Sequence, residues 1–167
     1  VGEPQATSTV PNSVWPCQWD LNDSYANGCS AYSSFDAGQD GKTALVNKFA
    51  VFNELSGSSD NTTVIDGVGT FCHEFSHCLG LPDFYDTRNT WYSNYGMNAW
   101  SLMDYGCYND DGNTPIGYDA YEREFMGWLT PIVPTPGQSY TLDPLNLETG
   151  EAVKIYNDKN QNEYFYL

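Results

Sequence analysis

Gly69-Thr-Phe-Cys-His-Glu-Phe-Ser-His-Cys-Leu-Gly-Leu-Pro-Asp83 is the most informative stretch of this 167-residue chain. It holds both histidines of the sequence, His73 and His77, and Glu74 directly follows the first of them. Residues four apart on an α-helix share one face, so the two imidazoles can converge on a single Zn²⁺. Glu74 would then stand beside the ion as general base for a zinc-activated water. The alternative interpretation is the solvated polar face of a surface helix.

A helix is predicted for this stretch because its apolar residues recur at helical spacing. These residues form one stripe: Val68, Phe71, Cys72, Phe75 and Leu79. Asp66 is the expected N-cap, and Gly80 is expected to end the helix in a left-handed conformation. Pro82 prevents continuation, so the chain turns sharply and Asp83 can return toward the metal.

A catalytic zinc usually has three protein ligands and one water, and no histidine remains to be the third ligand. The same shortage leaves no histidine for a Ser-His-Asp triad. The third ligand is therefore a carboxylate or, less readily, a cysteine or tyrosine. Asp83 is favoured by its position and Asp86 is the near alternative. Glu122 or Glu124, on a later predicted helix, is the distant alternative.

Residues 73–87, His-Glu-Phe-Ser-His-Cys-Leu-Gly-Leu-Pro-Asp-Phe-Tyr-Asp-Thr, resemble the active-site helix of the immune inhibitor A family of secreted bacterial zinc metallopeptidases. The pattern of that family is His-Glu-x-x-His-x-x-Gly-x-x-Asp. The resemblance implies that His73, His77 and Asp83 bind zinc and that Glu74 is the general base. It also implies an α+β, zincin-like metallopeptidase catalytic domain with an active-site helix, a methionine-turn and a β-rich segment at the C-terminal end.

Two later blocks extend the resemblance. Trp100-Ser-Leu-Met-Asp-Tyr-Gly106 is similar to the methionine-turn, which implies that Met103 forms an apolar floor beneath the ligands. Tyr105 stands where astacin-like and serralysin-like enzymes place a tyrosine that stabilises the oxyanion, so it is a catalytic candidate; the alternative is a packed aromatic side chain. Residues 115–131 resemble the segment that follows the turn.

The composition indicates a folded domain, with 40% hydrophobic and 16% aromatic residues. Six basic and 22 acidic residues leave a net charge of −16, which argues against nucleic acid and anionic membranes as partners. Carboxylates can also hold Ca²⁺. The loop Asn109-Asp-Asp-Gly-Asn113, with Asp110 and Asp111, is the candidate calcium site, although it lacks the EF-hand pattern.

Five cysteines allow at most two internal disulfides, and Cys17 with Cys29, which bracket a polar loop, is the favoured pair. Cys72 and Cys78 would lie about 9 Å apart along a helix, which is too far for a bridge. Both are expected to pack as small hydrophobic residues.

No stretch is long enough to span a bilayer, and the chain opens without a charged leader. The resemblance favours an extracellular bacterial protein. Both ends look cut, so we expect an excised piece of a longer precursor that has a propeptide or further domains and that supplies strands upstream of residue 1.

The remaining elements are predicted from short apolar runs and turn residues. Residues 1–43 are expected to be mostly ordered loop, and the part of the next strand near Phe49 to Asn53 is expected, by resemblance to zincins, to line the cleft and pair with extended substrate. The other expectations are strands at 44–55, 139–142, 152–156 and 163–167 and a short helix at 119–126. The domain prediction is a catalytic domain at 1–131 and a β-rich tail at 132–167.

These observations predict a secreted zinc-dependent endopeptidase that acts on proteins or peptides, with Zn²⁺ and a candidate Ca²⁺ as its ions. The alternative is a non-catalytic metal-binding or protein-binding fragment of a larger secreted protein. Replacing Glu74 by Gln separates the two, because only the enzyme needs that carboxylate.

Overall fold

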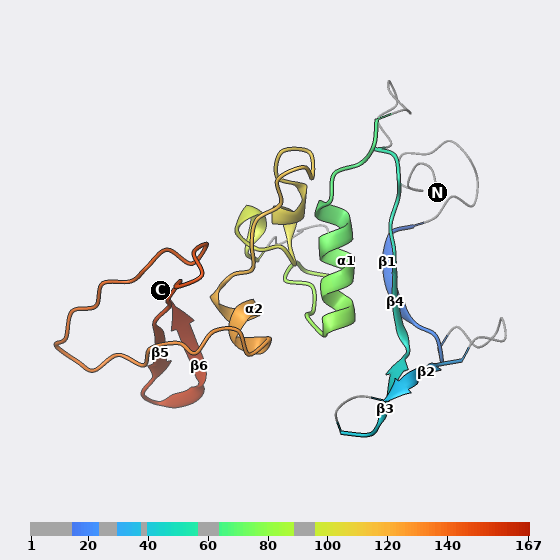
Figure 1. The fold of residues 1–167 in the computed structure, drawn as a ribbon. Coiled ribbons are helices and arrows are strands. Elements are labelled where there is room, and N and C mark those ends of the chain that lie inside the picture. The colour runs from blue at the N-terminus through green and yellow to red at the C-terminus, as the bar shows by residue number, and fades with distance from the viewer. Residues whose placement is uncertain (1–14, 24–29, 38–39, 57–63, 89–95) are drawn as a thin grey trace.

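A computed structural model describes residues 15–23, 30–37, 40–56, 64–88 and 96–167. Its described part combines helices with three two-stranded antiparallel sheets, which confirms the expected α+β mixture. In Figure 1, helix α1 stands at the centre, with strands β1 to β4 on one side of it and α2 and the β5–β6 hairpin on the other. This arrangement places one long helix between two groups of short strands.

The strands before α1 form two antiparallel pairs, one between distant segments and one between neighbouring segments. β1 (Cys17–Asp20) pairs with β4 (Lys48–Val51) so that Cys17 lies opposite Val51, and β2 (Tyr32–Ala37) pairs with β3 (Thr43–Val46). The expectation of mostly ordered loop at residues 1–43 was therefore wrong at these two strands, while residues 1–14, 24–29 and 38–39 lie outside the described residues. β1 and β2 are short strands among Ser, Asn and Asp residues, so only their pairing partners reveal them.

The single strand expected at 44–55 is divided at Asn47. Its backbone carbonyl accepts a hydrogen bond from the Leu21 amide at 2.6 Å, and its side-chain oxygen accepts one from the Asn22 amide at 3.0 Å. These bonds tie Asn47 to the turn that follows β1, so β3 ends before it and β4 begins after it.

Helix α1 (Gly69–Leu79) forms where it was predicted, but it begins differently. Val68 is the N-cap and makes no side-chain cap bond, while the Asp66 carboxylate accepts a hydrogen bond from the Asn53 amide at 2.6 Å. The expected Asp66 cap was therefore wrong. Gly80 ends the helix in the left-handed conformation with φ 106°, as predicted.

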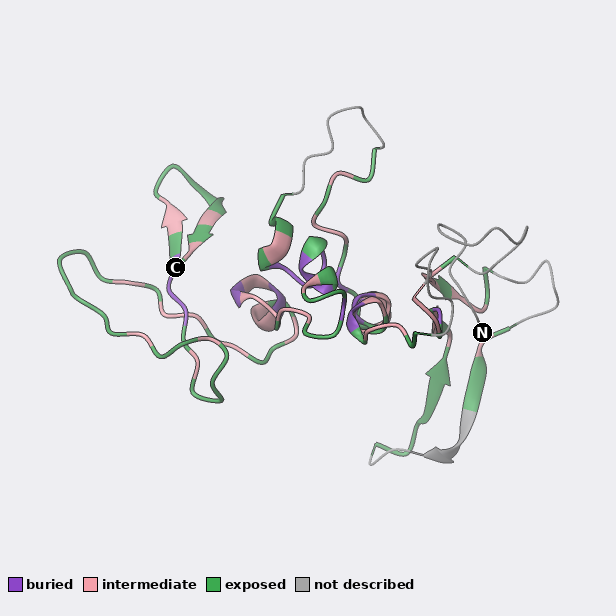
Figure 2. Cartoon of the chain, turned by 90° about the horizontal axis from the view of Figure 1, so that it is seen from above, coloured by how far each residue is buried: buried purple, intermediate pink, exposed green. Residues whose placement is uncertain are grey.

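The buried face of α1 is not its apolar stripe. Phe71, Phe75 and Leu79 are 40%, 46% and 42% exposed, whereas His73 and Ser76 are buried. Ser76 hydrogen-bonds the Tyr118 hydroxyl at 2.7 Å, so the helix packs its polar face against the later part of the chain. In Figure 2 most of the buried segments lie in and around the helices at the centre of the chain. The buried hydrophobic residues are Leu81, Leu102, Met103, Cys107, Ala120, Ala152 and Val153.

Between α1 and α2 (Ala120–Phe125) lie two short 3₁₀ helices, η2 (Asn98–Trp100) and η3 (Tyr105–Tyr108). The start of α2 carries a capping box, in which the Asp119 carboxylate accepts from the Glu122 amide and the Glu122 carboxylate accepts from the Asp119 amide. Gly127 follows with φ 74°, where the predicted helix was expected to stop.

The end of the chain forms a hairpin of β5 (Lys154–Asn157) and β6 (Asn160–Tyr166), which overlaps two of the predicted strands. The strand expected at 139–142 is wrong, because those residues are irregular. The hairpin is anchored to α2, since the Lys154 ammonium binds the Glu124 carboxylate at 2.8 Å and lies 4.0 Å from the Tyr164 ring centroid.

One prediction about the cysteines was wrong and another is confirmed. Cys17 carries a free thiol, so the expected bridge to Cys29 is wrong; Cys29 itself lies outside the described residues. Cys72 and Cys78 are free as expected, and both are partly exposed. In the part of the chain that the structure describes, no helix has the length and apolarity needed to cross a bilayer.

Candidate metal centre

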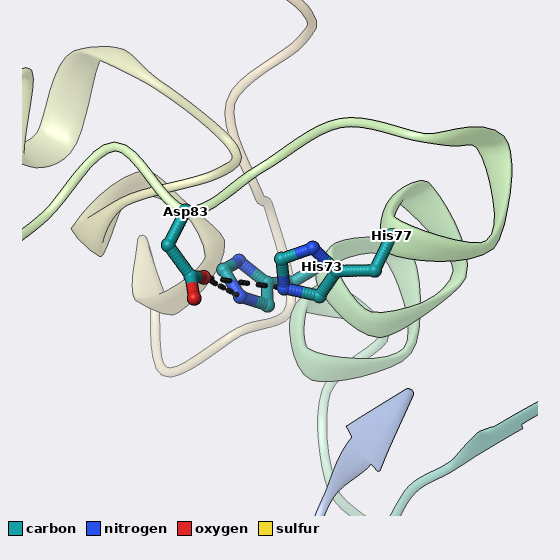
Figure 3. A group of neighbouring side chains, drawn as sticks. All are labelled: His73, His77 and Asp83. Atoms are coloured by element: carbon teal, nitrogen blue, oxygen red, sulfur yellow. Dashed lines mark hydrogen bonds and ion pairs between the residues drawn. The ribbon is translucent and has the colours of Figure 1, made fainter. Parts of the chain in front are cut away.

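Three side chains converge at one point beside α1. His73 and His77 project from successive turns of the helix, and the Nε2 atom of each lies 3.2 Å from the same oxygen, Oδ1 of Asp83 (Figure 3). Two ligands of a tetrahedral ion with bonds of about 2.0 Å stand about 3.3 Å apart. The spacing therefore fits a shared ion of the size of zinc. Among the described residues, this is the one group of three or more His, Cys, Asp or Glu that could hold a metal.

The far nitrogen of each ring is fixed by a backbone carbonyl. Nδ1 of His73 lies 2.9 Å from the Leu102 oxygen, and Nδ1 of His77 lies 2.7 Å from the Leu81 oxygen. Because a carbonyl oxygen can only accept, each Nδ1 donates its proton there. Nε2 of each ring therefore faces Asp83. It donates to the carboxylate when the ring is protonated, and loss of that proton would leave the lone pair that a metal ligand needs.

The electrostatics of the site favour a cation between these side chains. Burial disfavours the charged form of His73, but the Asp83 carboxylate outweighs that effect and raises the pKa of His73 to about 10. The same carboxylate raises the pKa of His77. Burial also opposes ionisation of Asp83, yet both imidazoles hold its pKa well below the usual range. Nitrogen and carboxylate donors of this kind are common zinc ligands.

Asp83 reaches the histidines because the helix is stopped just before it. Gly80 reverses the chain, its amide bonding the His77 carbonyl at 3.0 Å, and the buried Leu81 anchors the turn. The amide of Phe84 then donates to the Met103 carbonyl at 2.9 Å, which fixes the backbone directly after Asp83. The local turn thus places the carboxylate, and a distant segment holds it.

Glu74 lies in the same cleft as the three converging side chains, and its cavity has a volume of about 540 Å³. Burial raises the pKa of the Glu74 carboxyl, while His73 and His77 oppose that shift. A carboxylate beside a metal position can exchange protons with water. The cleft is lined by Trp15, Pro16, Cys17, Gln18, His73, Glu74, His77, Pro82, Asp83, Tyr85 and Thr87.

The strand that borders this cleft is β1, so the expectation that residues 49–53 line it was wrong. Cys17 and Gln18 of β1 face the site, and β4 pairs along β1 without contributing a lining residue. The missed signal was the short run Trp15-Pro-Cys-Gln-Trp-Asp20, in which apolar and polar residues mix as in a half-buried strand.

Tyr85 is a site residue that the sequence reasoning did not single out. Its ring stacks on the His73 imidazole with centroids 6.4 Å apart, and it lines the cleft. Burial and the charges of Asp83 and Glu74 raise its pKa. Tyr105, the predicted catalytic tyrosine, is not among the lining residues and packs its ring 5.3 Å from that of Tyr108. The catalytic role of Tyr105 stays a prediction.

The alternative third ligands make other contacts. Asp86 pairs with Arg88 at 2.8 Å, Glu124 binds Lys154, and Glu122 is enclosed in hydrogen bonds at the start of α2. The structure therefore brings Asp83, rather than these carboxylates, to the histidines. Met103 is fully buried in the segment that bonds both His73 and the turn after Asp83.

The candidate calcium residues are not gathered into a comparable group. Asp110 and Asp111 both have positive φ, 53° and 52°, and the Asp110 carboxylate accepts from the Thr114 hydroxyl at 2.8 Å. Neither belongs to the one metal-capable group of the described residues. A calcium ion at this loop stays a prediction.

Comparison with known proteins bears directly on this site. Residues 17–129, more than half of the chain, match the family described as "Immune inhibitor A peptidase M6, catalytic domain". The chain belongs to the immune inhibitor A peptidase family. The immune inhibitor A match includes β1, all of α1 and the turn to Asp83, and it ends before the β5–β6 hairpin. The chain thus carries a metallopeptidase domain, and the resemblance of residues 73–87 is confirmed.

Individual relatives match over shorter stretches. Immune inhibitor A of Bacillus thuringiensis subsp. alesti is 40% identical over 63 residues, which is 35% of this chain and 9% of that protein. Pre-pro-metalloprotease PrtV of Vibrio cholerae serotype O1 is 34% identical over 65 residues, which is 37% of this chain and 7% of that protein. The chain therefore matches less than a tenth of the length of these relatives.

Proposed function

We propose that this chain contains the catalytic machinery of a secreted, zinc-dependent endopeptidase. One observation carries the proposal. The Nε2 atoms of His73 and His77 each lie 3.2 Å from one carboxylate oxygen of Asp83, and backbone carbonyls hold the Nδ1 atoms of both rings, so that Nε2 is the nitrogen that faces the metal position. The bacterial source of the matched relatives supports a bacterial enzyme, and their printed names support proteolysis.

His73, His77 and Asp83 would hold the zinc ion, which would supply a Lewis acid for the scissile carbonyl and for the attacking water. Glu74 would accept a proton from the attacking water and deliver it to the leaving amine. The carboxylate is half-buried in the cleft beside the ligands. An extended substrate would run along β1 and pair with its backbone, because β1 borders the cleft.

The finer structural predictions belong to the same proposal. We propose a zincin-like catalytic domain at residues 1–131 and a separate β-rich tail at 132–167, which fits the start of the irregular segment leading to the β5–β6 hairpin. Met103 would be the floor of a methionine-turn beneath the ligands, and its complete burial supports this role. A propeptide or further domains of the same precursor would be additional partners.

The decisive test is cleavage of casein by the wild-type chain with and without a zinc chelator, beside Glu74→Gln. We expect chelation to abolish cleavage, added Zn²⁺ to restore it, and Glu74→Gln to bind zinc while losing activity. Cleavage that persists after chelation would contradict the proposal. A Glu74→Gln variant with intact biological function would favour the alternative, a non-catalytic binding domain.

The third ligand is tested by Asp83→Asn with Asp86→Asn as its matched control, since both remove one carboxylate from the same turn. Zinc content after dialysis should fall in Asp83→Asn and stay at the wild-type level in Asp86→Asn, because the latter carboxylate is paired with Arg88. Full zinc in Asp83→Asn would remove Asp83 from the ligand set.

A further inference from the structure

We propose that Glu122 of α2 is a positioning residue of the metal centre, which acts through the segment Ser101–Met103 on His73 and Asp83. The inference rests on the proposed zinc site. It concerns a residue outside the cleft, which neither touches the converging side chains nor belongs to the ligand motif. Its carboxylate is fully buried, at 0% exposure, and it lies 48 positions beyond the motif glutamate.

The carboxylate of Glu122 uses both of its oxygens. Oε1 accepts from the Ser101 hydroxyl at 2.9 Å and from the Met103 amide at 3.3 Å, while Oε2 accepts from the Asp119 amide at 2.6 Å. The Ser101 hydroxyl in turn accepts from the Met103 amide at 3.0 Å. One oxygen therefore caps α2 and the other holds the Ser101–Met103 segment.

The same segment holds two of the three metal-binding positions. The Leu102 carbonyl accepts from Nδ1 of His73 at 2.9 Å, and the Met103 carbonyl accepts from the Phe84 amide, directly after Asp83, at 2.9 Å. His77 is oriented separately, by the Leu81 carbonyl at the end of its own helix. Two ligands thus depend on Glu122 and the third does not.

The buried charge is hard to explain by packing alone. A buried carboxylate costs free energy unless its oxygens accept enough hydrogen bonds, and an apolar residue of similar volume is often equally stable. Capping α2 needs only the Oε2 side. The Oε1 side faces the two donors that fix the orientation of the Ser101–Met103 carbonyls, and outer-shell contacts of this kind tune metal affinity.

The test compares Glu122→Gln with Glu124→Gln, a matched substitution two residues along the same helix. Gln keeps the size of the side chain, but its NH₂ group cannot accept from the donors that surround both oxygens. Zinc affinity is measured by competition with a chelator, and ligand geometry by the visible absorption spectrum of the Co²⁺-loaded protein. Circular dichroism and thermal unfolding of the metal-free protein report on folding.

We expect Glu122→Gln to weaken zinc binding by about 10–100-fold and to change the Co²⁺ spectrum, because the His73 ring and the Asp83 turn lose their shared support. Glu124→Gln should keep both wild-type values, since its carboxylate contacts the hairpin through Lys154. Wild-type affinity and spectrum in folded Glu122→Gln would overturn the inference. An equal loss in Glu124→Gln would also overturn it, because the effect would then come from α2 in general.

Ser101→Ala keeps the inference testable if Glu122→Gln does not fold. It removes one donor to Oε1 and leaves the capping box of α2 intact. A smaller loss of zinc affinity in the same direction is expected, and an unchanged affinity would overturn the inference. A wild-type chain that binds no zinc, or that keeps its zinc after His73→Ala, would instead overturn the proposed function and this inference with it.

Discussion

Replacing Gly69 by alanine tests how closely the active-site helix approaches the loop beneath it. Gly69 is the first residue of α1, and its amide donates to the Gly112 carbonyl at 2.9 Å. A Cβ atom there would lie 1.8 Å from the Cys107 carbonyl oxygen. Because that neighbour is backbone, the helix or the loop would have to move by about 1 Å or more, which resembles overpacking of a core.

Three effects decide the size of the change. Alanine favours a helix over glycine by about 1 kcal/mol, whereas overpacking costs about 1–3 kcal/mol and loss of the Gly69 hydrogen bond about 0.5–1.5 kcal/mol. The net expectation is a loss of about 1–3 kcal/mol in the free energy of unfolding. At about 2–4 °C per kcal/mol for a chain of this size, the midpoint should fall by about 2–12 °C.

Thermal unfolding followed by circular dichroism measures this loss, with Gly117→Ala as the control. A Cβ at Gly117 would have one neighbour within 4 Å, an Arg123 nitrogen at 3.9 Å, so its midpoint should stay the same or rise slightly. A Gly69→Ala variant as stable as the wild type would refute the close packing of α1 on the segment from Cys107 to Gly112.

Two further predictions concern the cleft and the hairpin. Tyr85→Phe should lower kcat/KM by about 10²-fold or more with zinc content retained, as for loss of a donor at a developing oxyanion, because Tyr85 lines the cleft. An unchanged kcat/KM would contradict a catalytic role for Tyr85, and unchanged turnover of Tyr105→Phe would remove Tyr105 from the mechanism. Burial opposes ionisation of Glu124, but hydrogen bonds from Lys154 and Tyr166 outweigh it and lower its pKa. The ionised Glu124 carboxylate therefore stabilises the folded protein fully at pH values above its unfolded pKa of about 4.3. This stabilisation is lost as the pH falls through the lower pKa that Glu124 has in the folded protein. Near-UV circular dichroism of the hairpin tyrosines should change in that acid range, and Lys154→Met should remove this part of the pH dependence.

The features predicted correctly from sequence are those that depend on neighbouring residues. The left-handed end of α1 at Gly80 needs only a glycine at the right position, and the helix beginning after Asp119 needs only the Asp-x-x-Glu spacing of a capping box. The same kind of reasoning gave the wrong N-cap at Asp66, because the Asp66 carboxylate accepts a hydrogen bond from Asn53, 13 residues away. A local rule holds only where no distant partner competes.

The features missed from sequence come from long-range pairing. β1 lines the cleft because it pairs with β4, about 30 residues later, and neither strand has an alternation strong enough to reveal that pairing. Tyr85 lies in an aromatic-rich loop, where nothing local distinguishes it from the other tyrosines. The stripe of α1 looked like a core face, yet Phe71 and Phe75 remain partly exposed because the helix packs its polar side inward.

The metal centre itself joins both kinds of information. Its three converging side chains lie within 11 consecutive positions, from His73 to Asp83, so the motif alone identifies them. The orientation of His73 and Asp83 depends on Ser101–Met103 and, through that segment, on Glu122, none of which the motif contains. A chain could therefore keep every residue of the motif and still lose the 3.2 Å convergence if this support changed. It follows that the motif identifies the ligand residues, whereas the hydrogen bonds from the later part of the chain determine whether they share one ion.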